Sequence, residues 1–168
     1  MYGYVKVGSA VPKLRVADCV YNKEEILKLV EAAAAKQVRV LSFPELSVTG
    51  YTCADLFFQT PLLHAAEQAI QEIAEATKAL NIFLLIGAPI AVDNQMFNCA
   101  VALYRGKLLG IVPKTHIPNY SEFYEERWFA SADDLLTEEI TYAGRMFHRP
   151  QTDFPPLRIS CTEIGVES

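Results

Sequence analysis

The chain has 168 residues, of which 51% are hydrophobic, and this is enough apolar material to predict one compact domain. Its formal charge of −5 and pI near 5.2 argue against a nucleic-acid partner, because phosphate neutralisation requires clustered Lys and Arg. No apolar stretch reaches the roughly 18 residues typical of a membrane span, and the N-terminus lacks the pattern of a secretory signal, so we expect a cytoplasmic protein without a membrane partner.

The first part of the chain alternates between β-favouring stretches and helical patterns. Residues 5–11 favour a strand, and apolar residues at helical spacing over residues 23–36 predict an amphipathic helix. Asn22 and Glu25 have the spacing of a capping box, so we expect this helix to begin at Asn22. The apolar run at residues 38–43 then predicts a buried strand beside the first, joined to it through the helix.

A second helix and a hairpin continue this alternation. Thr60 has the chemistry of an N-cap, and apolar residues keep the helical period through residues 60–77. The apolar run at residues 82–92 predicts a third strand, and residues 96–113 predict two more, joined by a turn at residues 105–106. The resulting order, β-α-β-α-β-β-β, indicates an α/β fold.

Beyond the hairpin the periodicity weakens. Residues 114–156 are rich in Tyr, Phe, Glu and Pro, and we expect a long irregular segment there. Such segments in compact domains are usually functional or flexible. Residues 157–160 and 163–167 favour two further short strands.

The cysteines and histidines form no recognisable metal or redox motif. The cysteines lack a C-x-x-C pair and a neighbouring histidine pattern, so we expect reduced, mostly buried thiols and no metal. The glycines form neither a G-x-G-x-x-G nor a phosphate-binding loop, so no cofactor is expected in this chain. The residues concerned are Cys19, Cys53, Cys99 and Cys161, with His64, His116 and His148.

Two charged residues are expected at one edge of the sheet. Glu45 follows the strand predicted at residues 38–43, Lys114 follows the last strand of the hairpin, and a proline precedes each. The carboxyl ends of strands are where α/β sheets place their ligand-binding groups, although a charged loop residue facing water is the ordinary alternative. If the carboxylate and the ammonium converge, they suit general-base catalysis and oxyanion stabilisation.

The segments around these two residues resemble a known family. "FPELSVTGYTCADLFFQ" at residues 43–59 and "PKTHIPNYSEFYEERWF" at residues 113–129 closely resemble the nitrilase superfamily, or carbon-nitrogen hydrolases. Within it they are most similar to the glutaminase domain that precedes the synthetase domain of glutamine-dependent NAD synthetases. The resemblance implies an α/β fold, a nitrilase-like α-β-β-α sandwich that is incomplete at the C-terminus of this chain.

The resemblance also implies a Glu-Lys-Cys triad in which a cysteine thiolate attacks the side-chain amide of glutamine. Glu45 matches the general base of that triad, and Lys114 matches the lysine that stabilises the oxyanion. Tyr120 matches a position that helps to hold the glutamine. Glu125 corresponds to an additional acidic residue near the triad, with Glu122 and Glu126 as neighbouring candidates. Tyr51 either borders the site or is an ordinary loop aromatic.

The nucleophile of the family lies in a motif that runs Gly-Val-Glu-Ile-Cys-Glu-Asp. Residues 165–167 match its beginning, Ser168 departs from it, and the cysteine would follow directly. Cys161 lies about eight residues earlier, and eight strand residues displace a side chain by about 25 Å. We therefore do not expect Cys161 to act as the nucleophile.

The resemblance therefore implies that residues 1–168 are the N-terminal part of a glutaminase domain and are themselves inactive. The parent protein would hydrolyse glutamine to supply ammonia for NAD synthesis, with ATP and deamido-NAD bound by an absent synthetase domain. An incomplete layered core exposes apolar sheet surface, so a homo-oligomer is expected.

Two alternatives stay open from the sequence. One keeps the superfamily and changes the substrate to an aliphatic amide, an N-carbamoyl amine or a nitrile. The other is a noncatalytic binding or interaction module of the same fold.

Overall fold

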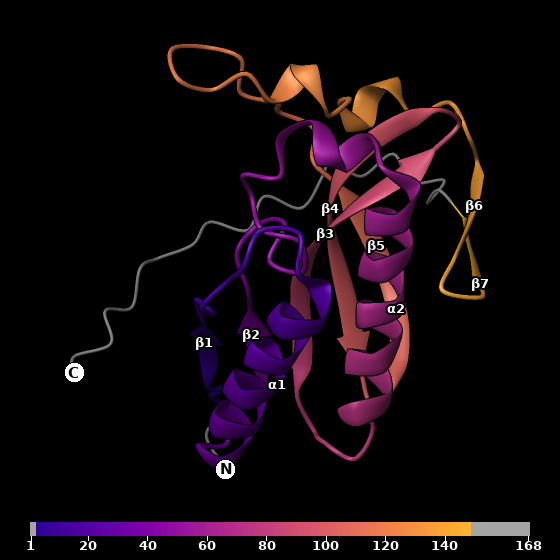
Figure 1. Ribbon diagram of the computed structural model, residues 1–168. Helices are drawn as coiled ribbons and strands as arrows, with labels where there is room; N and C mark the ends of the chain where they lie inside the picture. The colour runs from indigo at the N-terminus through magenta and orange to yellow at the C-terminus, as the bar shows by residue number, and fades with distance from the viewer. Residues whose placement is uncertain (1–2, 149–168) are drawn as a thin grey trace.

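A five-stranded sheet with two helices on one face makes up most of the computed structural model, which describes residues 3–148 (Figure 1). The first three strands are parallel, and the last two continue the sheet as an antiparallel hairpin. Together with the two helices this order confirms the predicted β-α-β-α-β-β-β sequence of elements. The strands lie in the order β1 (Val7–Ser9), β2 (Val40–Ser42), β3 (Phe83–Val92), β4 (Gln95–Tyr104) and β5 (Lys107–Pro113).

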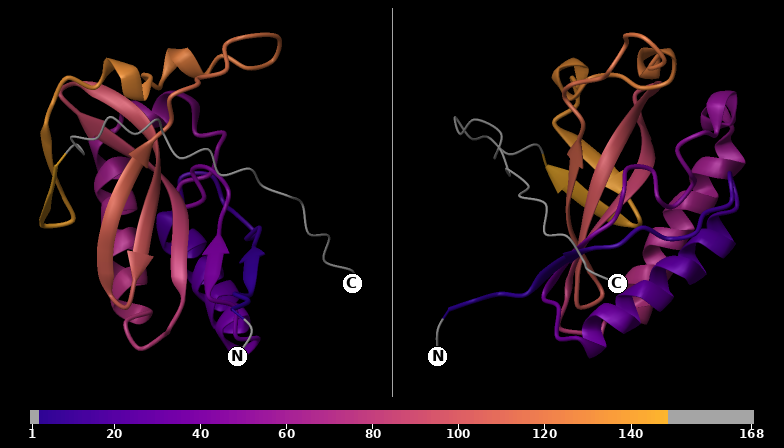
Figure 2. Two further views of the ribbon diagram at one scale, coloured as in Figure 1. Left: turned by 180° about the vertical axis from the view of Figure 1, so that it is seen from behind. Right: turned by 90° about the vertical axis from the view of Figure 1, so that its left-hand side faces the viewer.

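Both helices pack on the same side of the sheet. Helix α1 (Cys19–Ala35) connects β1 to β2, and α2 (Thr60–Ala76) connects β2 to β3. Because both crossovers proceed in the same direction across the sheet and crossovers are right-handed, their helices lie on one face. The right-hand view of Figure 2 shows both helices on one side of the sheet. Neither described helix combines the length and apolar composition that a membrane-spanning segment requires.

The predicted start of α1 was wrong by four residues. Asp18 is the N-cap and accepts the backbone N–H of Tyr21 at 3.0 Å. Asn22 lies inside the helix and is fully buried. Its side-chain amide accepts the backbone N–H of Arg15 and donates to the backbone carbonyls of Arg15 and Val48. The polar side chain that resembled a cap therefore ties two loops to the helix instead.

Helix α2 agrees more closely with its prediction. It begins at Thr60, but the N-cap position belongs to Gln59, which makes no side-chain capping bond. Thr77 caps the other end, and its hydroxyl donates to the carbonyl of Ile73 at 2.8 Å. The predicted span of residues 60–77 is therefore confirmed to within one residue at each end.

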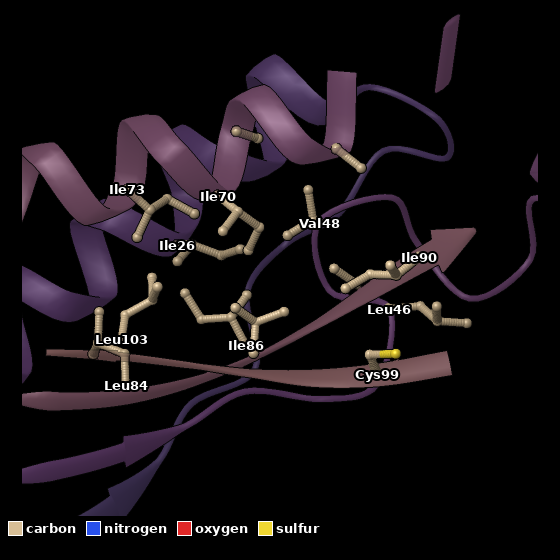
Figure 3. Packing of buried hydrophobic residues seen from close by; sticks show 14 of the residues in the cluster. Ile26, Leu46, Val48, Ile70, Ile73, Leu84, Ile86, Ile90, Cys99 and Leu103 are labelled. Atoms are coloured by element: carbon tan, nitrogen blue, oxygen red, sulfur yellow. The ribbon is translucent and has the colours of Figure 1, made fainter. Parts of the chain in front are cut away.

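The hydrophobic core lies between the helices and the sheet. Figure 3 shows Ile26, Ile70 and Ile73 of the helices facing Leu84 and Ile86 of β3, and all five are fully buried. The alternation of β strands sends the intervening side chains to the other face. That face carries apolar side chains such as Leu85 and Val112. Within residues 3–148 it has no second helix or sheet layer stacked on it (Figure 2).

A second, two-stranded sheet lies in a region predicted to be irregular. Strands β6 (Glu139–Tyr142) and β7 (Arg145–His148) pair as an antiparallel hairpin. Its turn places Ala143 and Gly144 at φ of 54° and 69°, the conformation that favours two-residue hairpin loops. The Ala143 N–H donates to Glu67 of α2 at 2.7 Å, which anchors the turn. The strands predicted at residues 157–160 and 163–167 lie outside the described residues.

Strands β2 and β5 end beside the middle of the longer β3 and β4, because the last residues of β2 and β5 pair as Ser42 with Leu85 and Pro113 with Cys99. β2 and β5 run in the same direction, so the loops that follow them emerge at one end of the sheet. The segment after β5 crosses this end, at the top of Figure 1. It contains two short 3₁₀ helices, η2 (Glu125–Arg127) and η3 (Ala132–Asp134), while η1 (Ala54–Phe58) belongs to the loop after β2.

Candidate active site

The loop after β2 holds Glu45 in a tight, buried turn. Leu46 adopts a φ of 53°, and its carbonyl accepts the N–H of Gly50 at 2.7 Å. The Val48 N–H donates to the carbonyl of Gly87 at 3.2 Å, so the turn is bonded to β3. The Glu45 side chain, in contrast, is 50% exposed, so the carboxylate is presented at the sheet edge by a rigid loop.

Lys114 connects two carboxylates. Its backbone N–H donates to the carbonyl of Asn98 at 2.8 Å, which continues the pairing of β4 and β5 by one residue. Its ammonium lies 2.9 Å from Glu45 Oε2 and 3.0 Å from Glu125 Oε2. The structure thus brings together three of the residues singled out in the sequence, across 69 positions of the chain between Glu45 and Lys114.

Glu125 is the buried member of this group. Only 4% of its side chain is exposed, whereas Glu122 and Glu126 face solvent, so the structure selects one of the three candidate glutamates. Its carboxylate accepts a hydrogen bond from the Tyr51 hydroxyl in addition to the Lys114 contact. A buried carboxylate is costly unless it is paired and hydrogen-bonded, and both conditions are met here.

The neighbouring carboxylates raise the pKa values of Lys114 and Tyr51. Burial by itself lowers the pKa of Lys114, but the hydrogen bonds and charges of Glu45 and Glu125 outweigh it and raise the pKa above its ordinary value. Burial and then the hydrogen bond to Glu125 raise the pKa of Tyr51. Lys114 is therefore a cation and Tyr51 a neutral donor at neutral pH.

Asn98 is a site residue that the sequence analysis missed. It is 3% exposed, and its side-chain amide donates to Glu45 Oε2 at 2.9 Å. Its backbone carbonyl accepts the backbone N–H of Lys114. It therefore holds both charged residues from β4. The available signal was a single amide within the otherwise apolar run "MFNCAVALY" of a buried strand, where a polar group needs a partner.

A shallow cavity opens beside the charged group. It has a volume of about 240 Å³ and is lined by Glu45, Asn98 and Lys114 together with apolar strand residues. Tyr120 does not join this contact network. Its side chain is exposed, and its ring packs edge-on against Phe123 with centroids 5.9 Å apart.

The described cysteines are unsuited to nucleophilic attack. Cys19, Cys53 and Cys99 are free and buried. Cys99 neighbours Asn98 in β4, but alternation sends its sulfur to the helix side of the sheet (Figure 3). Burial raises its pKa to about 12, and burial raises the pKa of Cys19 to about 11. Cys161 lies outside the described residues, and no cluster of metal-ligating side chains occurs within residues 3–148.

Comparisons with known proteins show the family of the chain. The carbon-nitrogen hydrolase family model matches residues 6–167. The glutamine-dependent NAD(+) synthetase of Mycobacterium leprae is 36% identical over 132 residues, which are 79% of this chain and 19% of that protein. The chain therefore spans about a fifth of the length of such curated relatives.

Solved structures show the same arrangement of elements. The crystal structure of a glutamine-dependent NAD(+) synthetase from Cytophaga hutchinsonii matches with a TM-score of 0.78 at 28% identity, covering 85% of this chain and 24% of that one. An amidase from Nesterenkonia sp. matches with a TM-score of 0.61 at 20% identity, covering 82% and 52%. The second likeness bears on the fold alone.

Proposed function

The chain belongs to the carbon-nitrogen hydrolase family and has its nitrilase-like α/β fold, and from this premise we propose that the described residues form the acid-base part of a site that, in the parent protein, hydrolyses the side-chain amide of glutamine. The observation that carries the proposal is the position of Lys114, whose ammonium lies 2.9 Å from Glu45 and 3.0 Å from Glu125 beside a cavity at the strand ends. The relatives named as glutamine-dependent NAD(+) synthetases support glutamine as the substrate.

In the proposed reaction a cysteine thiolate attacks the amide carbon. Glu45 takes the thiol proton and gives it to the amide nitrogen, so that the C–N bond breaks, ammonia leaves and a thioester remains; its half-exposed carboxylate is accessible for this exchange. Lys114 stabilises the tetrahedral oxyanion, which requires the positive charge that its two carboxylate partners maintain. Water then hydrolyses the thioester and regenerates the thiol.

The described residues supply the acid-base and electrostatic part of this site. The three cysteines within residues 3–148 are buried with pKa values raised by burial, so none of them suits attack at neutral pH. We propose that the nucleophile comes from the family motif whose beginning is matched at residues 165–167. On this basis the 168-residue chain is proposed to release no ammonia by itself.

We also propose how this chain fits into a longer protein, where that protein is located and how it associates. Residues 1–168 are proposed to be the N-terminal part of a glutaminase domain, with Tyr120 contacting the glutamine and the ammonia serving NAD synthesis. ATP and deamido-NAD are assigned to a synthetase domain outside this chain. A cytoplasmic location is supported by free thiols, and a homo-oligomer by exposed apolar side chains such as Val112.

The test begins with the coding region beyond codon 168. We expect the frame to continue into Cys-Glu-Asp and its product to release ammonia from glutamine, with Glu45→Gln slowing release by about 100-fold or more. The 168-residue chain should release none. Glu45-dependent ammonia release by that chain would place a nucleophile within it.

The same assay separates the two alternatives. Turnover of aliphatic amides or N-carbamoyl amines in preference to glutamine would favour the second substrate class. An intact gene with a stop codon directly after residue 168 would favour a noncatalytic module.

A further inference from the structure

One exposed carboxylate joins the two segments that supply Tyr51 and Glu125. Asp55 lies in η1, four residues after Tyr51, and accepts three N–H donors from the neighbourhood of η2. Arg127 donates through Nε at 3.0 Å and through Nη2 at 2.9 Å, and Trp128 donates its indole N–H at 3.0 Å. The donors are the second and third residues after Glu125.

The geometry of this contact specifies an orientation. The guanidinium of Arg127 uses two N–H groups on the two oxygens of Asp55, a bidentate pairing that permits little rotation. Beneath it, the ring of Phe57 packs edge-on against Trp128, with centroids 6.4 Å apart, and against Phe129 at 4.9 Å. The apolar contact holds the segments together, and the polar contact determines how η2 is turned.

The orientation of η2 matters because it is a single turn with two adjacent glutamates. Glu125 points inward to Lys114, whereas Glu126 faces solvent and accepts from Asn119. A rotation of this turn would withdraw the buried carboxylate from Lys114. We propose that Asp55 is a positioning residue, which fixes the register of η2 through Arg127 and thereby keeps Glu125 against Lys114.

A role in stability alone fits the contact less well. The side chains of Asp55 and Arg127 are 62% and 58% exposed, and ion pairs at such positions contribute little to folding because water already solvates them. The hydrogen bonds from Arg127 and Trp128 lower the pKa of Asp55 to about 2, so the acceptor is ionised at neutral pH. The contact is therefore present under ordinary conditions, and its consequence is expected at the site.

The chain contains its own reporter for this contact. Trp128 is the only tryptophan in the sequence, so its indole N–H gives one assignable resonance. A second reporter is the side chain of Lys114, followed by NMR after isotopic labelling of lysine. Its pKa should fall when Glu125 is withdrawn, because burial then lowers it with less opposition.

The experiment compares Asp55→Ala, which removes both carboxylate oxygens, with three other variants of the 168-residue chain. In Asp55→Ala we expect the indole N–H to exchange at least about tenfold faster and the pKa of Lys114 to fall, with the thermal midpoint nearly unchanged. Asp55→Glu should restore part of both signals. Glu125→Gln should lower the pKa of Lys114 and leave the exchange of the Trp128 indole N–H unchanged. Glu75→Gln, which removes the carboxylate of an exposed pair with Lys78, should change neither the pKa nor the exchange rate.

Two results would overturn the proposal. One is an unchanged Lys114 titration in Asp55→Ala despite a released indole N–H, which would show that Glu125 keeps its place without the contact. The other is loss of folding in Asp55→Ala, which would give Asp55 a structural role. A positioning role for Asp55 rests on the proposed function. Both reporters are independent of ammonia release, so the positioning role and the proposed function can fail separately.

Discussion

Gly87 is the position where one added methyl group should disturb the site most directly. A Cβ built at Gly87 would lie 2.3 Å from the backbone nitrogen of Leu46 and 2.5 Å from the carbonyl oxygen of Pro44. It would also lie 2.7 Å from the carbonyl carbon of Glu45. All three atoms belong to the backbone, so no side-chain rotation can relieve the overlap, and Gly87→Ala must push the loop away from β3.

The size of the effect follows from these distances. Ordinary contacts of a Cβ begin near 3.4 Å, so the loop has to move by about 1 Å. Overpacking of this kind costs about 1–3 kcal/mol of unfolding free energy. The movement also separates Glu45 from Lys114 and Asn98, each now at 2.9 Å, and a misplacement of about 1 Å can reduce turnover by about 100-fold.

Gly110→Ala provides the matched control for this substitution. Gly110 lies in β5, which β4 separates from β3, and nothing lies within 4 Å of a Cβ built there. Urea unfolding of both variants measures the stability cost, and the NMR signal of the Lys114 side chain measures the displacement of Glu45. Equal stability of the two variants together with an unchanged Lys114 signal would refute the reasoning.

Four further predictions concern the buried and charged groups. Since burial raises the pKa of Cys99 to about 12, its thiol should resist alkylation at pH 8 in the native state, which peptide mapping by mass spectrometry checks. Because the pKa of Cys99 is raised in the folded state, the stability that its neutral thiol contributes is fully present below the unfolded-state pKa of about 8.5 and is lost as the pH rises toward 12. The urea midpoint of unfolding should therefore fall between about pH 8.5 and 10.5, and it should fall less steeply in Cys99→Ala. Asn98→Asp places a second carboxylate against Glu45 and should lower the free energy of unfolding by about 1–3 kcal/mol at pH 7; a variant as stable as the parent in urea would contradict this. Tyr51→Phe removes the hydroxyl that donates to buried Glu125 and should cost about 1–2 kcal/mol by the same measurement, whereas an unchanged midpoint would show that water replaces the donor.

Local signals were sufficient for the order of elements. Helical spacing over residues 60–77 and the apolar runs at residues 38–43 and 82–92 are periodic patterns, and each is confirmed by the structure to within a few residues. Two helical crossovers keep β1, β2 and β3 parallel, and two successive hairpins return β5 to the direction of β3, so the shared edge of Glu45 and Lys114 followed from the order of elements.

Local signals failed where a polar residue is satisfied by a distant partner. Asn22 resembled a helix cap but is buried and bonded to Val48, 26 residues away. Asn98 gave little sign of the Glu45 contact, because its partner is 53 positions distant. The hairpin at residues 139–148 depends on its anchor to Glu67 in α2, so weak alternation within the segment did not reveal it.

The sequence by itself therefore determined the order of the elements and the edge of the sheet where Glu45 and Lys114 meet, because periodicity and strand direction are properties of short segments. Only the tertiary structure decided which glutamate is buried against Lys114. That choice depends on how the contacts of Asp55 and Phe57 orient the turn at residues 125–127. The free energy of the buried Glu125 carboxylate depends on all of its partners together.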